Sequence, residues 1–415
     1  MANLLERASV VLTPTAYNNG EALCIKPDDA SGDFQFSRNS AATRVNAQGL
    51  VENVQILSSN LVQNGDFSEE GVQEVSNGSF SQESSEVVVN GDFALNSNWS
   101  GTNTIANGQL IKGSGGGLVY QGTLDGTIKS YKVTIDVAEK NGVSLNLYLG
   151  GSQFPLNEGT QTLYIQSGNG NTFIGFNNGA NSVINSISCV EVGQNWTLGT
   201  GWSIAEDKAI CDGLQAYQQL RQGTVNGVIG KNYLVKYTVS DNNGAGGIQA
   251  KFGGVNLSSY NSSNGSFEFY VEAISTDYIR FIPQLDFIGS ITNISVKEVG
   301  QNWALETGWS IGDDVATCDG TNAVSIQQPL ATVNTKLKKI TFTVSNYVSG
   351  TVRFYSGAGA DVLYEVSQNG TFTYYDYLVF NKIFIYSSSS FNGSVTDISI
   401  IEITTDTSLP RINYE

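Results

Sequence analysis

The stretch Trp196-Thr-Leu-Gly-Thr-Gly-Trp202 occurs again, with few changes, as Trp303-Ala-Leu-Glu-Thr-Gly-Trp309. An earlier stretch, Phe93-Ala-Leu-Asn-Ser-Asn-Trp99, has the same order of an aromatic residue, a leucine and a tryptophan. The stretches at 196–202 and 303–309 begin 107 residues apart, and the segments Ile187–Gly193 and Ile294–Gly300 repeat at that same spacing. Repetition over this length predicts tandem domains rather than one large core.

A shorter repeat precedes these stretches. Asn64-Gly-Asp-Phe67, Asn77-Gly-Ser-Phe80 and Asn90-Gly-Asp-Phe93 follow one another every 13 residues. We interpret the first two as duplicated module starts that act as a linker or as edge strands, and we align Phe93 with Trp196 and Trp303. The expected division is an N-terminal anchoring segment (1–60), a linker (61–86), module 1 (87–193), module 2 (194–300), module 3 (301–404) and a C-terminal tail (405–415).

Apolar and polar residues alternate within each module. The alternation runs through 131–137 in module 1, 233–239 in module 2 and 340–344 in module 3. Strands of this kind, separated by Gly and Asn turns in modules of about 105 residues, are typical of antiparallel two-sheet sandwiches. We therefore expect an all-β chain: a small N-terminal anchoring segment followed by three tandem β-sandwich (jelly-roll) domains with little helix. We expect the glycine-rich stretch Gly113–Gly117 to be a hairpin turn.

Composition excludes several classes of function. The 415 residues carry a formal net charge of −17, which argues against binding to nucleic acid or to an anionic membrane. The chain has no histidine, so Ser-His-Asp and Cys-His catalytic systems are excluded. We expect no enzymatic activity, although two carboxylates of a glycosidase remain compatible with the sequence.

Four cysteines lie far apart, and none forms a Cys-x-x-Cys pair or a zinc-ligand spacing. Cys211 and Cys318 occupy the same position in two modules, which indicates buried filler rather than a disulfide. No basic segment followed by an apolar segment opens the chain, so we expect no secretory signal and synthesis in a reducing cytoplasm.

Aromatic residues give the candidate binding sites. Trp99, Trp196, Trp202, Trp303 and Trp309 are all the tryptophans of the chain, and with Phe93 they fall in the repeated stretch. We interpret them as a packing device, and the alternative is a platform for sugars. The cluster Tyr374, Tyr375 and Tyr377 is our candidate glycan site, and an edge strand is its alternative. We expect no cofactor, but a structural calcium ion could use oxygen ligands of Asp28, Asp29 and Asp33, or of Asp313 and Asp314; plain surface turns are the alternative.

Two features resemble structural proteins of tailed bacteriophages, fibres especially. The run Asp33-Phe-Gln-Phe-Ser-Arg-Asn-Ser-Ala-Ala-Thr-Arg-Val-Asn-Ala-Gln-Gly-Leu-Val-Glu52 and the distant Leu409-Pro-Arg-Ile-Asn-Tyr414 resemble two halves of one segment of these proteins. Here the modules stand between the halves, as though inserted. The Asn-Gly-Asp-Phe openings and the segment Ile294-Ser-Val-Lys-Glu-Val299 are similar to jelly-roll modules of carbohydrate-binding type in such proteins. In these proteins further domains normally follow the second half, whereas this sequence stops at Glu415.

The resemblance implies a head or tail fibre or decoration protein that is made in the host cytoplasm and works in the virion. Residues 1–60 would then contact other virion proteins, and a homo-oligomer, a trimer by preference, would display the modules toward a host-surface glycan. The rival interpretations are a carbohydrate-active protein, either a depolymerase or a stand-alone adhesin, and a structural collar or spacer without a ligand.

Overall fold

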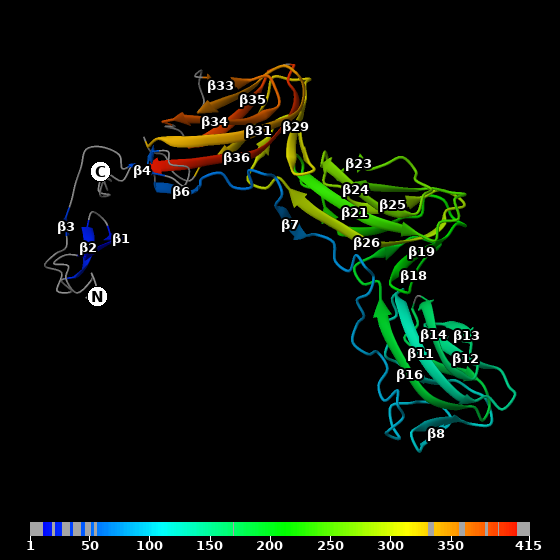
Figure 1. Ribbon diagram of the computed structural model, residues 1–415. Helices are drawn as coiled ribbons and strands as arrows, with labels where there is room; N and C mark the ends of the chain where they lie inside the picture. Colours follow the sequence, from blue (N-terminus) through cyan, green and yellow to red (C-terminus); the bar gives the residue numbers. More distant parts are fainter. Residues whose placement is uncertain are drawn as a thin grey trace. The chain divides into compact units, whose positions relative to one another are not determined.

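A computed structural model shows an all-β protein, and the residues that it describes contain no helix (Figure 1). It describes residues 11–18, 21–26, 34–35, 43–45, 51–53, 56–168, 170–330, 336–356, 362–377, 381–388 and 390–404. Among these residues no helix could cross a membrane. The chain divides into two compact units, one of residues 1–69 with 300–415 and one of residues 70–299.

The N-terminal region contains short strands. Strands β1, β2 and β3 form one antiparallel sheet, and β4 pairs with β5. Most of the expected anchor, the calcium candidates Asp28, Asp29 and Asp33, and the tail 405–415 lie outside the described residues. The bounds are β1 (Val11–Asn18), β2 (Glu21–Lys26), β3 (Phe34–Gln35), β4 (Thr43–Val45) and β5 (Val51–Asn53).

Module 1 is a sandwich of two antiparallel sheets. Its small sheet has the order β10-β15-β12-β13, and its large sheet has the order β14-β11-β16-β9-β8. The strands are β8 (Asn103–Ala106), β9 (Gln109–Lys112), β10 (Val119–Gln121), β11 (Ser130–Glu139), β12 (Leu145–Leu149), β13 (Ser152–Pro155), β14 (Gly159–Gln166), β15 (Ile174–Asn178) and β16 (Val183–Val192).

Module 2 has the same two layers. Its small sheet is β17-β20-β25-β22-β23, and its large sheet is β18-β19-β26-β21-β24 with β7 (Glu70–Gln73) paired to β26. The other strands are β17 (Thr197–Leu198), β18 (Trp202–Ala205), β19 (Lys208–Asp212), β20 (Leu220–Asn226), β21 (Asn232–Ser240), β22 (Ile248–Phe252), β23 (Val255–Asn256), β24 (Gly265–Glu272), β25 (Tyr278–Pro283) and β26 (Ile288–Val299).

Module 3 repeats the arrangement within the other compact unit. Its small sheet is β27-β30-β35-β32-β33, and its large sheet is β28-β29-β36-β31-β34 with β6 (Ile56–Asn60) paired to β36. The other strands are β27 (Ala304–Leu305), β28 (Trp309–Gly312), β29 (Val315–Asp319), β30 (Ser325–Pro329), β31 (Lys338–Ser349), β32 (Val352–Ser356), β33 (Val362–Val366), β34 (Gly370–Asp376), β35 (Lys382–Ser387) and β36 (Asn392–Thr404).

Successive strands cross repeatedly between the two sheets, which is the connectivity of a jelly roll. In module 2 the chain passes from β20 in the small sheet to β21 in the large sheet, back to β22, and later crosses at β24, β25 and β26. The alternating apolar residues of facing strands fill the space between the sheets. Val235, Tyr237 and Phe281 are buried in this core, as the sequence pattern predicted.

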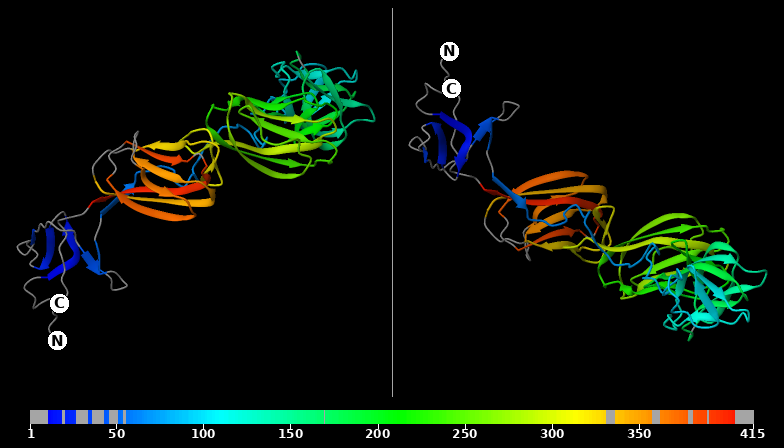
Figure 2. Two further views of the ribbon diagram at one scale, coloured as in Figure 1. Left: turned by 90° about the horizontal axis from the view of Figure 1, so that it is seen from above. Right: turned by 90° about the horizontal axis from the view of Figure 1, so that it is seen from below.

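The segment 56–93 takes part in all three modules, in reverse order along the chain. β6 pairs antiparallel with β36 of module 3, and Thr404 lies opposite Ile56. β7 then pairs with β26 of module 2. Residues 84–91 finally run beside β16 of module 1. Figure 2 shows the blue strand β6 beside the red strand β36 in both views. The chain thus contacts module 3 first, module 2 second and module 1 last before it builds them in forward order.

Each Asn-Gly-x-Phe repeat is anchored to one module by the same set of bonds. In module 2 the backbone N–H of Ile294 donates to the carbonyl of Gly78 over 2.9 Å. The side chain of Gln222 accepts from the N–H of Ser76 and donates to its carbonyl, both over 2.8 Å. The equivalent glutamines, Gln121 and Gln328, bond Val89 and Gln63 in modules 1 and 3.

The repeat forms a tight turn with an aromatic anchor. Asn77 and Phe80 both have positive φ, at 50° and 57°, and Phe80 is buried with its ring 5.2 Å from that of Trp196. A Cβ on Gly78 would meet the carbonyl oxygen of Ile294 at 2.0 Å, so only glycine allows this close approach. The corresponding residues at 64–67 and 90–93 have the same positive φ angles at Asn and Phe.

Our alignment of Phe93 with Trp196 and Trp303 is wrong. The indole N–H of Trp99 donates to the carbonyl of Asn90, just as the indoles of Trp196 and Trp303 donate to Asn77 and Asn64. Trp99 is therefore the counterpart of Trp196 and Trp303, and Phe93 is the counterpart of Phe80 and Phe67. The alignment was wrong by six residues because the repeat at 90–93 runs directly into module 1, whereas the repeats at 77–80 and 64–67 lie far in sequence from Trp196 and Trp303.

The glycine-rich stretch and the Asp313–Asp314 pair connect strands in different ways. Gly113–Gly117 is not a hairpin, because it connects β9 of the large sheet to β10 of the small sheet. Asp313 and Asp314 do form a two-residue hairpin turn between β28 and β29, with φ of 50° and 59°. Among the described residues no group of three His, Cys, Asp or Glu side chains could hold a metal ion.

Candidate functional site

The tryptophans face the interior of the modules. Trp202 and Trp309 are buried near Phe287 and Phe391, and Trp309 is only 2 % exposed. Trp196 and Trp303 are buried against the repeats, and Trp99 packs against the core of module 1. Rings in these positions contribute to packing, and the buried ones offer no free face to a sugar.

The three tyrosines of the candidate cluster do not share one face. Tyr374 and Tyr375 are neighbours on β34, so their side chains point to opposite sides of the sheet. The ring of Tyr374 stacks on that of Tyr364, with centroids 3.4 Å apart, and lies 6.1 Å from Phe342. Tyr375 and Tyr377 are 53 % and 61 % exposed. The structure therefore leaves two exposed tyrosines here rather than a three-ring platform.

The outer faces of the small sheets offer a different candidate. The buried glutamines Gln121, Gln222 and Gln328 mark equivalent positions on β10, β20 and β30, so the outward residue just before each can be compared between modules. The cross-strand register then extends the comparison to the two neighbouring strands. The equivalent outward rows are Tyr120, Gly175 and Tyr148 in module 1; Arg221, Arg280 and Lys251 in module 2; and Gln327, Phe384 and Tyr355 in module 3.

The row of module 1 is aromatic and uncharged. Tyr120 and Tyr148 flank Gly175, which has no side chain, and both rings are half-buried. The ring of Phe173 lies 4.5 Å from that of Tyr120. The amide of Asn171 donates to the Tyr148 hydroxyl over 2.9 Å, which orients that ring. Fixed aromatic rings beside side-chain amides are groups that can stack on sugar rings and bond their hydroxyls.

The row of module 2 is cationic. Arg221, Arg280 and Lys251 lie directly opposite one another on β20, β25 and β22. Tyr278 lies beside them, and its hydroxyl accepts a hydrogen bond of 2.9 Å from the Arg221 guanidinium. The Arg280 guanidinium forms a salt bridge with Asp277.

The row of module 3 mixes aromatic and charged groups. The ring of Tyr355 packs edge-on against Tyr386, with centroids 5.6 Å apart. Nε of Arg353 lies 3.0 Å from a carboxylate oxygen of Glu365. Hydrogen bonds to Tyr355 and to Glu365 raise the pKa of the Arg353 guanidinium, so it remains charged. Half-buried Phe384 lies opposite Tyr355.

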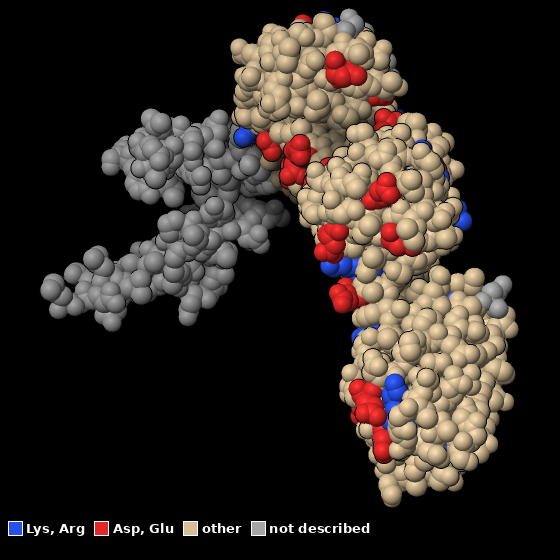
Figure 3. Space-filling view, turned by 90° about the vertical axis from the view of Figure 1, so that its right-hand side faces the viewer, with Lys and Arg blue, Asp and Glu red and all other residues tan. Residues whose placement is uncertain are grey.

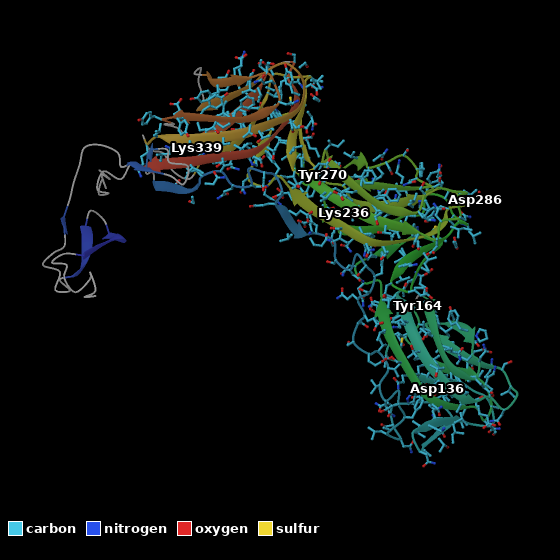
Figure 4. The ribbon with its side chains drawn as sticks, in the orientation of Figure 1. Asp136, Tyr164, Lys236, Tyr270, Asp286 and Lys339 are labelled. Atoms are coloured by element: carbon cyan, nitrogen blue, oxygen red, sulfur yellow. The ribbon has the colours of Figure 1, made fainter. Side chains whose placement is uncertain are left out.

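The outer faces of the large sheets are less aromatic. They carry many Thr and Ser side chains, such as the facing hydroxyls of Thr134 and Thr162, together with charged residues and a few tyrosines such as Tyr375. Asp136, Lys236 and Lys339 come from β11, β21 and β31 of these sheets (Figure 4). The face drawn in Figure 3 is largely uncharged, with scattered Asp and Glu side chains and a few Lys or Arg side chains. The small sheets are therefore the better candidates for ligand contact.

Sequence reasoning missed these rows because it compared modules by their shared residues. The repeated tryptophans are the most evident shared residues, but their side chains pack inside the modules. A signal was available at the outward residue before each of Gln121, Gln222 and Gln328, where the side chain changes from Tyr to Arg to Gln. That signal needs the correct register of the modules, which our alignment lacked.

The buried thiols take no part in these faces. Cys189, Cys211 and Cys318 are free and buried. Burial raises the pKa of the Cys189 and Cys211 thiols, which keeps them protonated and unreactive. In module 1 Lys112 stands where the other two modules have Cys211 and Cys318, because it lies at the same hairpin position.

Comparisons with known proteins give little more. No protein-family model matches the chain, and no curated protein matches it. Among solved structures, it is similar to the N-terminal CBM22-1-CBM22-2 tandem domain of Xyn10C from Paenibacillus barcinonensis, with 8 % identity and a TM-score of 0.20. That match covers 52 % of this chain and 94 % of the other, and at this TM-score it carries no weight for function.

Proposed function

We propose that this protein is a bacteriophage virion component, a head or tail fibre or decoration protein, that presents its sandwich modules for adhesion to host-surface glycans. The observation that carries the proposal is the pairing of β6 with β36. There the hydroxyl of Ser58 accepts from the N–H of Glu402, a residue 344 positions away in the sequence. The two parts of the chain that resemble one segment of phage structural proteins are thus connected to neighbouring strands.

This pairing supports the interpretation of the modules as an insertion. A chain that leaves the N-terminal segment at β6 and returns beside it at β36 can contain any number of inserted modules, provided that each module folds as a complete unit. Segment 56–93 contributes backbone contacts to each of the three modules and so helps to complete each one. Residues 1–60 would then serve as the contact with other virion proteins, in a homo-oligomer.

The outer rows of the small sheets support adhesion as the task of the modules. Their interior positions repeat, whereas the outward positions change from aromatic to cationic to mixed. The shared fold does not require these differences, and ligand contacts that differ between modules would account for them. The two carboxylates beside these rows, Asp277 and Glu365, each form a salt bridge with an arginine, which favours binding over glycoside hydrolysis.

Two experiments test the proposal. The full-length protein should bind at least one bacterial capsular or lipopolysaccharide glycan on an array, and Tyr120→Ala or Tyr148→Ala should weaken binding if module 1 is the site used. Within a phage genome that encodes the chain, deletion of residues 1–60 should remove the protein from purified particles, as measured by mass spectrometry. Undiminished incorporation of the truncated protein would refute the anchor, and absence of the intact protein from particles would refute the virion assignment.

A further inference from the structure

Three positive charges lie in register on the small sheet of module 2. Arg221 and Lys251 are the direct partners of Arg280 on the two neighbouring strands. Adjacent strands are about 4.8 Å apart, so the row spans roughly 10 Å. Like charges directly opposite on a sheet repel and destabilise the pairing.

The repulsion is only partly offset within the molecule. Asp277 pairs with Arg280, so one of the three charges is neutralised. Arg221 bonds the neutral hydroxyl of Tyr278, and none of the described residues forms a salt bridge with Arg221 or Lys251. Arg221 and Lys251, one on each side of Arg280, therefore have no carboxylate partner among the described residues.

The sheet itself does not require this row. At the same three positions module 1 has Tyr120, Gly175 and Tyr148, and module 3 has Gln327, Phe384 and Tyr355, none of which is charged. Both modules form the same sheet with these residues. A repulsive row that the fold does without in two of three copies indicates a ligand that neutralises it.

Tyr278 fixes the geometry of the row rather than offering a stacking surface. The guanidinium carbon of Arg221 lies 5.5 Å from the centre of the Tyr278 ring, and that of Arg280 lies 5.2 Å from it. Contacts of this kind hold guanidinium groups in place by cation–π attraction. A guanidinium so oriented presents parallel N–H donors, the arrangement that binds a carboxylate with two hydrogen bonds.

We propose that the row Arg221, Arg280 and Lys251 binds carboxylate groups of an acidic saccharide, such as the uronate residues of a bacterial polysaccharide. This inference rests on the proposed glycan-adhesion function and names the ligand class of module 2. The chain carries a net charge of −17, so its overall charge disfavours such a polymer. The row then supplies a local attraction for a carboxylated glycan against this overall repulsion, which gives the site its selectivity.

The test uses the full-length protein and titration calorimetry with oligogalacturonate as the carboxylated probe. A neutral galactan oligomer of equal length and a glycerol-phosphate polymer are the comparison probes. Arg221→Gln and Lys251→Gln should each weaken oligogalacturonate binding at least tenfold, and Arg221→Lys should restore part of it. Lys236→Gln is the matched control, because it removes the same charge from β21 of the opposite sheet, where Lys236 pairs with Glu268 (Figure 4).

The possible outcomes separate this inference from the function on which it rests. Binding of oligogalacturonate that falls in the row variants and not in Lys236→Gln supports the inference. Equal binding of the neutral oligomer, binding of only the phosphate polymer, or no effect of the row variants overturns it while glycan adhesion stands. Failure of the full-length protein to bind these probes or any bacterial glycan on the array overturns both.

Discussion

Replacing Phe80 by alanine should destabilise module 2, although residue 80 directly precedes module 1 in the sequence. Phe80 is 1 % exposed, and its ring contacts Trp196 in the core of module 2. Truncating a buried phenylalanine to alanine costs about 3–5 kcal/mol. Since a tenfold change in an equilibrium corresponds to about 1.4 kcal/mol, the opening equilibrium of module 2 should rise by a factor of roughly 100 to 4,000.

Hydrogen–deuterium exchange of the full-length protein, resolved by peptide mass spectrometry, measures this effect for each module separately. Peptides from β21 and β26 should lose protection by that factor, and peptides from β11 and β16 should keep theirs. Phe93→Ala is the matched control, because the same change one repeat later should act on module 1 instead. Loss of protection in module 1 alone on Phe80→Ala would refute the reversed assignment of the repeats.

Two further predictions concern buried polar groups. Gln222→Ala should lower the unfolding free energy of module 2 by about 1–3 kcal/mol, because two hydrogen bonds between the buried Gln222 side chain and the backbone of Ser76 are lost. An unchanged urea midpoint would contradict this. Lys112 is buried and bonds the carbonyls of Gly117 and Phe176, and burial lowers its pKa to about 8 from 10.5. The unfolded chain therefore holds this proton more tightly than the folded chain. As the pH rises from 8 to 10.5, the free energy of unfolding of the wild type should increase by about 3 kcal/mol relative to that of Lys112→Met. A difference between the two proteins in urea unfolding that does not change with pH would refute this.

Local sequence patterns predicted the class of fold and the central strands of the modules. β11 (Ser130–Glu139) and β21 (Asn232–Ser240) contain the alternating stretches that the sequence shows at 131–137 and 233–239. Alternation works here because one side of each strand faces a core between two sheets, so burial imposes a period of two. The interior positions of the tryptophans also follow from their return beside the same leucine in each copy.

Long-range pairing could not be obtained in the same way. The 13-residue spacing of Asn64, Asn77 and Asn90 shows that three similar turns exist, but it does not say which module each one contacts. That choice depends on bonds between residues far apart, such as Trp303 with Asn64, 239 positions away. The candidate rows were missed for the same reason, since facing residues on β20, β25 and β22 are brought together only by the register of the sheet.

The reversed order of the repeats also determines the order in which the modules can complete their folds during translation. The ribosome makes Phe67 early, but its partner Trp303 only after modules 1 and 2 have been translated. At about 5–20 residues per second, this interval lasts roughly 12–50 s. Module 1 can close as soon as β16 emerges, module 2 waits for β26, and module 3 waits for β36. During that time the apolar side chains of the first turn, Val62 and Phe67, lack the partners that bury them in the finished fold, and apolar surface exposed in this way is prone to aggregation until module 3 is complete.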